Sequence, residues 1–283
     1  MYKSFIYFVL FLNLFHSTAQ EVNSLWETHF SYYNVNDLES NGPYIYASSD
    51  NSIFIYNTQT SELTKITTKQ GLAGEAISSI YFSSNHNKLI VGFVNGLIQV
   101  IDFNTSNIFS IYDIIDKTTI SPDSKRINNF NELDQHIYIS TDYGISVFNL
   151  DSLEFGDTFF IGISGAQVRV AETTVLGEYF YAACKDFEGI KRSLISSNLI
   201  DFNNWSEVFS GSFHAILSVE NSIYFSDQNK IYNIVNGIIS EVFTSNEIIK
   251  DIRYISDSFI ITTQNNTSTY DINFNSISTP IIS

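Results

Sequence analysis

The polar residues best placed for chemistry are aspartates and asparagines that stand between short apolar runs. Both residue types accept hydrogen bonds from their own backbone and tolerate left-handed conformations, so turn formation is one interpretation. A ligand-binding or partner-binding rim is the other, because loops on a rigid scaffold carry much of a protein's function. Calcium is less favoured, since no Asp-x-Asp-x-Asp-Gly loop occurs, and we predict no metal site. The rim residues are Asp50, Asn95, Asp142, Asp186 and Asp227.

Two basic doublets, Lys125-Arg126 and Lys191-Arg192, are candidate anion contacts. Solvated loops or strand ends are the alternative and the favoured interpretation. The chain has 14 Lys and Arg against 30 Asp and Glu, a net charge of −16. Such a balance opposes non-specific nucleic-acid binding, which depends on Lys and Arg displacing counterions. We therefore expect no nucleic-acid partner.

Catalytic motifs are missing from the sequence. The histidines at 29, 86, 136 and 214 are scattered without a His-Glu-x-x-His pair, and there is no Gly-x-Ser-x-Gly elbow, Walker loop or dinucleotide fingerprint. The single cysteine, Cys184, is expected to be a packing residue rather than a reactive thiol, because Lys185 alone is weak support for a lowered pKa. We predict a protein that is not an enzyme and has no cofactor. A propeller lyase or glycosidase is a weaker alternative, which would need facing carboxylates or a histidine-bound metal at the central channel.

These residues sit in a repeated unit. Residues 89–102 read LIVGFVNGLIQVID, two apolar runs around Asn-Gly, which is a β-hairpin signal. Comparable hairpins begin at 45, 137, 180, 223 and 259, so the spacings along the chain are 44, 48, 43, 43 and 36 residues. This spacing is typical of a four-stranded propeller blade.

Each hairpin lies between two further strand-like runs, which gives the order a, b, tight turn, c, d. Examples of strand a are 76–82, 127–133, 214–220 and 248–255, and examples of strand d are 108–114, 205–209 and 239–243. A single four-stranded meander cannot bury both faces, but blades packed around an axis can. The sequence therefore predicts an all-β fold, a β-propeller of four-stranded antiparallel blades with six repeats.

The first twenty residues differ from the rest. Lys3 precedes an apolar run from Phe5 to Phe15, and Ser17-Thr18-Ala19 resembles a cleavage signal. The run is far shorter than the ~20 residues that a membrane span requires. We interpret residues 1–19 as a secretory signal peptide and 20–283 as the propeller domain, with no transmembrane span; a short first strand or helix is the alternative.

The two ends of the domain leave the ring size open. Residues 25–33 precede the first strand a and have the place of a strand d, so Trp26–Phe30 could close a six-bladed ring. The last eight residues, SISTPIIS, could also form a strand d, and both segments cannot fill one slot. We favour an incomplete seven-bladed ring in an N-terminal fragment of a longer protein.

Several runs resemble known families. The hairpins and QGLAGEAISSIYFS, beginning at Gln70, resemble the two-component regulator propeller repeat of exported sensory proteins. The runs at 26–38, 66–83, 138–162 and 189–192 are similar to the N-terminal propeller of PorZ proteins, found in the type IX secretion system of Bacteroidota. The likeness extends from about Trp26 to Arg192 and weakens after Trp205.

The PorZ resemblance implies a role beyond what the repeats predict. PorZ proteins have two propellers and a C-terminal sorting domain, lie on the outer surface of the outer membrane, and assist the sortase that attaches anionic lipopolysaccharide to cargo. It implies an exported, outer-membrane-associated interaction module whose partners are the type IX sortase, associated attachment-complex proteins, and lipopolysaccharide or another glycan. The acidic charge favours a scaffold that faces the sortase. The alternative function is the extracellular glycan-sensing propeller of a hybrid two-component regulator, and the sequence that follows the propeller in the gene would discriminate the two.

Overall fold

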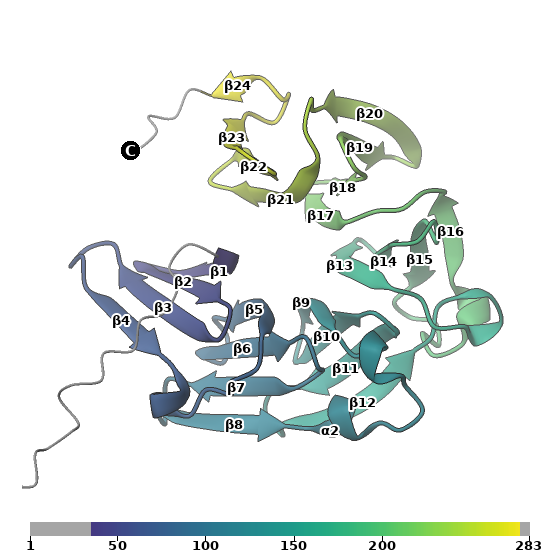
Figure 1. The fold of residues 1–283 in the computed structure, drawn as a ribbon. Helices are drawn as coiled ribbons and strands as arrows, with labels where there is room; N and C mark the ends of the chain where they lie inside the picture. The colour runs from purple at the N-terminus through teal and green to yellow at the C-terminus, as the bar shows by residue number, and fades with distance from the viewer. Residues whose placement is uncertain (1–34, 278–283) are drawn as a thin grey trace, which may run out of the picture. The chain divides into compact units, whose positions relative to one another are not determined.

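Six four-stranded antiparallel sheets make up the protein, arranged as the blades of a β-propeller (Figure 1). The computed structural model describes residues 35–277, so the predicted signal peptide and Trp26–Phe30 lie outside the described residues. In each blade consecutive strands pair in chain order, from the innermost strand a to the outermost strand d. The predicted all-β propeller with six repeats is confirmed.

The strands follow the order expected from the repeats. Blade 1 contains β1 (Val35–Asn41), β2 (Tyr44–Ser49), β3 (Ser52–Asn57) and β4 (Leu63–Ile66); blade 2 contains β5 (Ile77–Ser83), β6 (Lys88–Phe93), β7 (Ile98–Asp102) and β8 (Asn107–Ile111); blade 3 contains β9 (Ile127–Leu133), β10 (His136–Thr141), β11 (Gly144–Asn149) and β12 (Glu154–Phe159). Blade 4 contains β13 (Val170–Leu176), β14 (Tyr179–Cys184), β15 (Ile190–Leu194) and β16 (Ser206–Phe209); blade 5 contains β17 (Ala215–Val219), β18 (Ser222–Ser226), β19 (Lys230–Val235) and β20 (Ile238–Thr244); blade 6 contains β21 (Ile249–Ile255), β22 (Ser258–Thr263), β23 (Thr267–Tyr270) and β24 (Ser276–Ile277).

Short helical turns interrupt the links between strands. They are η2 (Thr68–Gln70), α2 (Asp113–Asp116), η3 (Pro122–Ser124), η4 (Ile163–Gly165) and η5 (Phe202–Asn204). One of them corrects the prediction for 108–114: β8 ends at Ile111, and Asp113-Ile114 begin α2. The buried side chain of Ile114 helps to fill the core between blades 2 and 3, which explains why the apolar pattern continues past the strand.

The propeller has two rims that carry different loops. Because the strands alternate in direction, the turns between strands b and c share one rim with the links from each strand d to the next strand a. We call this the b–c rim. The turns between a and b and between c and d share the opposite rim, the a–b rim. No helix within residues 35–277 is long and apolar enough to cross a membrane.

Five apolar clusters hold neighbouring blades together, one at each junction from blade 1 to blade 6. Aromatic pairs reinforce three of them: Tyr46–Phe82, Tyr138–Phe180 and Tyr224–Phe259 each have ring centroids 4.8 Å apart. Apolar burial of this kind is the main favourable contribution to folding. Each blade therefore depends on its neighbours for a complete core.

One position of strand c contributes the same residue to all five apolar clusters. Strand c of blades 1 to 5 carries a fully buried isoleucine opposite a small residue of strand b, and the five are Ile53, Ile98, Ile145, Ile190 and Ile231. In blade 6 the same position is Thr267, which is exposed and pairs with Thr262. Blade 6 thus lacks the buried isoleucine that strand c carries in blades 1 to 5.

This position provides a matched pair of substitutions. Ile231→Thr is expected to lower the free energy of unfolding by about 2 kcal/mol, because it removes buried apolar volume and buries a hydroxyl. Thr267→Ile, the reverse change at the same place in blade 6, is expected to stay within about 0.5 kcal/mol of the wild type. Denaturant unfolding of both variants would measure this. Equal losses in the two variants would contradict this difference between blade 6 and the other blades.

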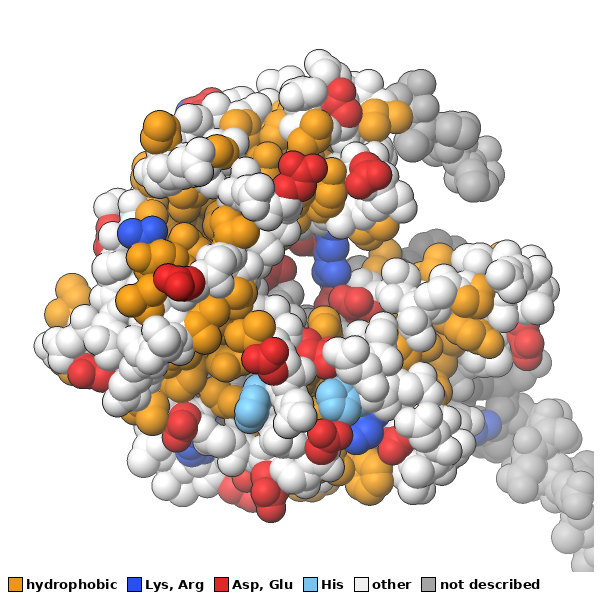
Figure 2. Space-filling view, turned by 180° about the vertical axis from the view of Figure 1, so that it is seen from behind, with side chains coloured by type: hydrophobic (Ala, Val, Ile, Leu, Met, Phe, Trp, Pro, Cys, Tyr) orange, Lys and Arg blue, Asp and Glu red, His pale blue; other side chains and the backbone are white. Residues whose placement is uncertain are grey.

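The sixth junction, between blades 6 and 1, is ionic. Arg253 of β21 donates from Nη2 to Oδ1 of Asp37 in β1 at 2.9 Å, and from Nη1 to Oε1 of Glu39 at 3.3 Å. Its Nε donates to Asp251 of its own strand at 2.8 Å. Figure 2 shows basic and acidic side chains meeting at the centre of the ring. The innermost strands of the first and last blades are therefore joined by one arginine.

Strand d of blade 6 comes from the end of the chain. β24 pairs with β23 through Thr269–Ile277 and Tyr270–Ser276, so the prediction that SISTPIIS contributes a short strand d is confirmed for its first two residues. No residue within 35–277 remains to build a seventh blade, and the incomplete seven-bladed ring stays a prediction about sequence outside that range.

Candidate functional site

The five predicted rim residues all lie on the b–c rim, in the turns between strands b and c. Two of them shape their turns: Asn95 Oδ1 accepts from the Leu97 amide at 3.0 Å, and Asp227 Oδ1 accepts from the Lys230 amide at 2.9 Å. Asp50 is exposed, and its carbonyl accepts from the Ile77 amide of the next blade. Turn chemistry therefore explains part of the pattern, and partner binding at this rim stays a prediction.

Asp142 and Asp186 take part in a charged cluster that links blades 3 and 4. Arg169 lies between them, with Nε 3.5 Å from Asp142 and Nη1 3.3 Å from Asp186. Lys185 donates to Asn128 at 3.2 Å, and burial lowers its pKa. This cluster fixes the turn that follows β14. Within residues 35–277 no three His, Cys, Asp or Glu side chains are arranged to hold a metal ion.

The four candidate anion contacts differ in their burial and in their partners. Lys125 and Lys191 are buried: the Lys125 ammonium donates to the Ile115 carbonyl, and Lys191 lies 3.2 Å from Glu188. These two lysines have partners inside the chain, and their role as contacts for an outside anion stays a prediction. Arg126 and Arg192 are partly exposed, and Arg192 lines a cavity.

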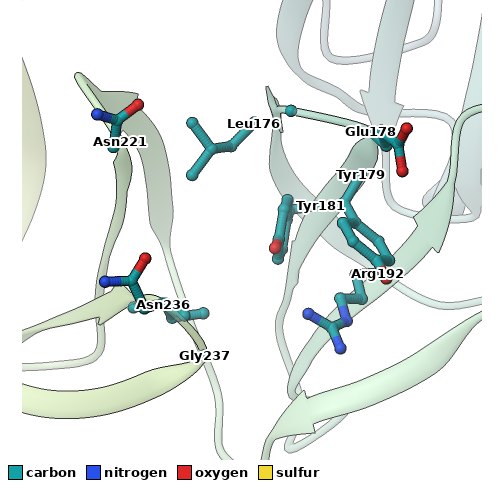
Figure 3. Close-up of a pocket in the computed structure, with 10 residues that line it drawn as sticks. Leu176, Glu178, Tyr179, Tyr181, Arg192, Asn221, Asn236 and Gly237 are labelled. Carbon is teal, nitrogen blue, oxygen red and sulfur yellow. The ribbon is translucent and has the colours of Figure 1, made fainter.

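That cavity lies on the a–b rim between blades 4 and 5 (Figure 3). It has a volume of 330 Å³. The end of β13, β14 and β15 form its blade 4 side, and the turns at Asn221 and at Asn236-Gly237 form its blade 5 side. Gly177, Asn236 and Gly237 have positive φ angles, which these tight turns require and which Gly and Asn tolerate.

Two tyrosines and an arginine dominate the chemistry of the cavity. The rings of Tyr179 and Tyr181 are 6.2 Å apart, and the Arg192 guanidinium lies 4.5 Å from the centre of the Tyr179 ring. Within the described residues this cation–π contact is not accompanied by an ion pair at Arg192. Asn221 and Asn236 add amide donors and acceptors. Aromatic faces beside a free guanidinium and amides suit a ring-shaped polar ligand that carries an anionic group.

A second polar cluster lies on the same rim at the junction of blades 2 and 3. His86 Nδ1 is 2.9 Å from Ser83 Oγ, and its Nε2 is 3.3 Å from Asp151. Glu132 accepts from Ser83 at 3.1 Å and from Tyr81 at 3.1 Å. The order serine, histidine, aspartate resembles a catalytic triad, but the Ser83 side chain is fully buried. We interpret the cluster as a hydrogen-bonded link between two blades.

Cys184 lies at the end of β14 and is fully buried. Burial raises the pKa of its thiol to about 12, so the thiolate that reactive cysteines need is disfavoured. The prediction of a packing role is confirmed.

Sequence reasoning missed the cavity, although it singled out Arg192. The lining residues come from turns of two consecutive repeats, and none of those turns has a recognised binding motif. The one available signal was the pair of tyrosines at 179 and 181, which point to the same face of a strand because side chains alternate.

Comparison with known proteins agrees with this architecture. The family model described as TSS9, PorZ, N-terminal beta-propeller domain matches residues 45–206. Among solved structures, PorZ from Porphyromonas gingivalis, a bacterial surface component of the type IX secretion system, is similar with a TM-score of 0.72 and 13% identity, over 88% of this chain and 33% of that one. The chain thus spans about a third of the length of that protein. No curated protein sequence matches.

Other propellers are similar at the same level. The extracellular domain of BT4673 from B. thetaiotaomicron, a candidate one-component system, has a TM-score of 0.65 and 13% identity, over 86% of this chain and 34% of that one. U3-55K has the same TM-score and identity, over 86% of this chain and 79% of its own. At such identities the similarity concerns the fold alone.

Proposed function

Because this chain belongs to the family of PorZ N-terminal β-propeller domains, we propose that it is a non-catalytic interaction module of the type IX secretion system. In this proposal the protein is exported and works at the outer-membrane surface. Its protein partners are the sortase and the associated attachment-complex proteins. The predicted signal peptide at 1–19 supports export, and the surface location of PorZ from P. gingivalis supports the place of action.

The observation that carries the ligand side of the proposal is Arg192 over Tyr179 in the cavity on the a–b rim. The chain has a large excess of acidic groups, yet this guanidinium has no ion pair among the described residues. An anionic sugar could stack on Tyr179, which is partly exposed, and pair with Arg192. We therefore propose that the cavity binds lipopolysaccharide or another glycan. The predicted partner rim, with Asp50, Asn95, Asp142, Asp186 and Asp227, would face the protein partners.

Deleting the gene tests the secretion role. We expect type IX cargo to accumulate with its sorting signals uncleaved, and a copy of the gene supplied in trans to restore cleavage. Normal processing of cargo in the deletion strain would refute the role.

The glycan site makes a separate prediction. Arg192→Ala and Tyr179→Ala are each expected to weaken binding to immobilised lipopolysaccharide from the source bacterium at least tenfold, because each removes half of the cation–π contact and a ligand surface. Arg126→Ala removes the same charge on the opposite rim and should bind as the wild type does. Surface plasmon resonance would measure the three. Equal affinity of all variants would exclude the cavity as the site.

A second candidate function is a glycan-sensing propeller of a two-component regulator. The fold similarity to the extracellular domain of BT4673 favours this alternative. Sequencing the gene beyond Ser283 discriminates them: a second propeller and sorting domain would support secretion, whereas a membrane span and a kinase would support sensing.

A further inference from the structure

The turn after β14 presents an exposed aromatic side chain in a strained backbone. Phe187 is 84% exposed, and its φ angle is +65°. Asp186 before it also has a positive φ, of +56°. A bulky side chain in the left-handed region is a genuine outlier, and such strain persists only where the surroundings determine the conformation.

The surroundings of this turn do determine it. The Asp186 amide donates to Ser212 Oγ at 3.1 Å, and the Gly189 amide donates to the Gly211 carbonyl at 2.8 Å. The Asp186 carboxylate pairs with Arg169, and Glu188 pairs with Lys191. Hydrogen bonds and ion pairs thus fix the turn on both sides of Phe187.

The ring itself does not contribute to the core. Phe187 belongs to none of the apolar clusters and forms none of the aromatic pairs described within 35–277. Because the backbone of this turn is already ordered before a partner arrives, less conformational entropy is lost when Phe187 binds. Large, rigid aromatic groups are the residues that dominate protein interfaces.

We propose that Phe187 is the anchor residue of a protein–protein interface on the b–c rim. It would insert into an apolar pocket of a folded partner protein whose surface around that pocket is basic. The basic character follows from the net charge of −16 on the chain, since Asp186 and Glu188 on either side of Phe187 are already paired with Arg169 and Lys191. The same charges disfavour insertion into a membrane rich in anionic lipid.

The test uses outer-membrane vesicles from a strain that lacks this gene, before and after their surface proteins are removed by protease. The purified chain and Phe187→Asn are compared, because asparagine tolerates a positive φ and the variant should fold with an unchanged or higher Tm. Ile200→Asn is the matched control, an equivalent loss of an exposed apolar side chain in another loop of blade 4. The inference rests on the proposed function for the choice of the outer membrane and for the b–c rim as the side that faces protein partners.

We expect the wild type and Ile200→Asn to bind intact vesicles with equal affinity, and protease treatment of the vesicles to abolish this binding. We expect Phe187→Asn to bind intact vesicles at least tenfold more weakly than the wild type. Three binding results would overturn the proposal: no binding by the wild type, equal binding by Phe187→Asn, or an equal loss of affinity of Phe187→Asn for protease-treated vesicles. A Tm of Phe187→Asn lowered by more than about 5 °C would also overturn it, because it would indicate a structural role. Self-association of the wild type that Phe187→Asn abolishes would also overturn it, since the pocket would then belong to a second copy. The cargo-processing test of the deletion strain is independent, so the two proposals can fail separately.

Discussion

Replacing Arg253 by alanine is expected to lower the free energy of unfolding by about 3 kcal/mol, the lower end of the cost of breaking a buried ion pair. Arg253 is the link between the innermost strands of the first and last blades, through Asp37 at 2.9 Å and Glu39 at 3.3 Å. Its side chain is 33% exposed, which is why we expect less than the full cost. Burial opposes its charge, but Asp251 and Asp37 outweigh burial and raise its pKa.

The loss has two parts. Without the guanidinium, the carboxylates of Asp37 and Asp251 repel each other across the junction and Glu39 loses its partner. No apolar cluster of the described residues replaces the lost contact there. Denaturant unfolding would measure the change. Lys230→Ala is the matched control, because it removes a cation from an exposed pair, 2.5 Å from Glu241, and should leave stability unchanged. An Arg253→Ala protein as stable as this control would contradict the role of Arg253 in joining blades 6 and 1.

Stability is also expected to fall as the pH rises from 5 to 8, by on the order of 3 kcal/mol. Burial is the main cause that raises the pKa of Glu39 from 4.5 to about 7 and that of Glu172 from 4.5 to about 8. Asp251 and Asp37 raise both pKa values further, and Arg253 opposes them. Between pH 4.5 and these values the folded protein holds protons that the unfolded chain has released. The stabilisation is therefore complete below pH 4.5 and is lost as the pH rises through 7 and 8.

Glu172→Gln tests the origin of this slope. Glu172 accepts from the Asn129 amide at 2.9 Å and from the Ile216 backbone amide at 2.7 Å, so it joins three consecutive blades. A glutamine can keep the bond to Ile216 if Asn129 rotates its amide, and it does not titrate. Thermal unfolding at pH 5, 6.5 and 8 should then show a flatter profile than that of the wild type. A wild-type Tm that rises from pH 5 to pH 8 would contradict the assignment.

The fold could be predicted because each blade repeats the same local chemistry. Asn95-Gly96 and the alternating apolar runs around it specify a hairpin without any distant contact, and Gly96 has the expected positive φ of +89°. Five further copies at nearly constant spacing then exclude other arrangements of the sheets. Most strand boundaries agree to within one or two residues, as for β9 at 127–133, whereas the strand predicted at 108–114 ends at Ile111.

The junctions between blades could not be predicted in the same way. Each innermost strand except that of blade 5 contains a register shift near its start. In blades 1 and 4 the residue after the shift is a carboxylate that accepts a hydrogen bond from the backbone of the next blade. In the sequence, nothing distinguishes Asp37 and Glu172 from other acidic residues in predicted strands. Their partners, the amides of Ile80 and Ile216, lie more than 40 residues away. Local pattern does not encode such contacts.

Strand β14 connects the two surfaces discussed above. Tyr179 begins the strand at the cavity on the a–b rim, and Cys184 ends it one residue before the turn that carries Asp186 and Phe187 on the b–c rim. Six residues of β-strand span about 20 Å. A glycan and a protein bound at the two ends of β14 would not overlap, and the strand would hold them at a fixed separation. If one membrane complex displayed both, the first contact would raise the effective concentration of the second, and two weak affinities would combine into one strong attachment.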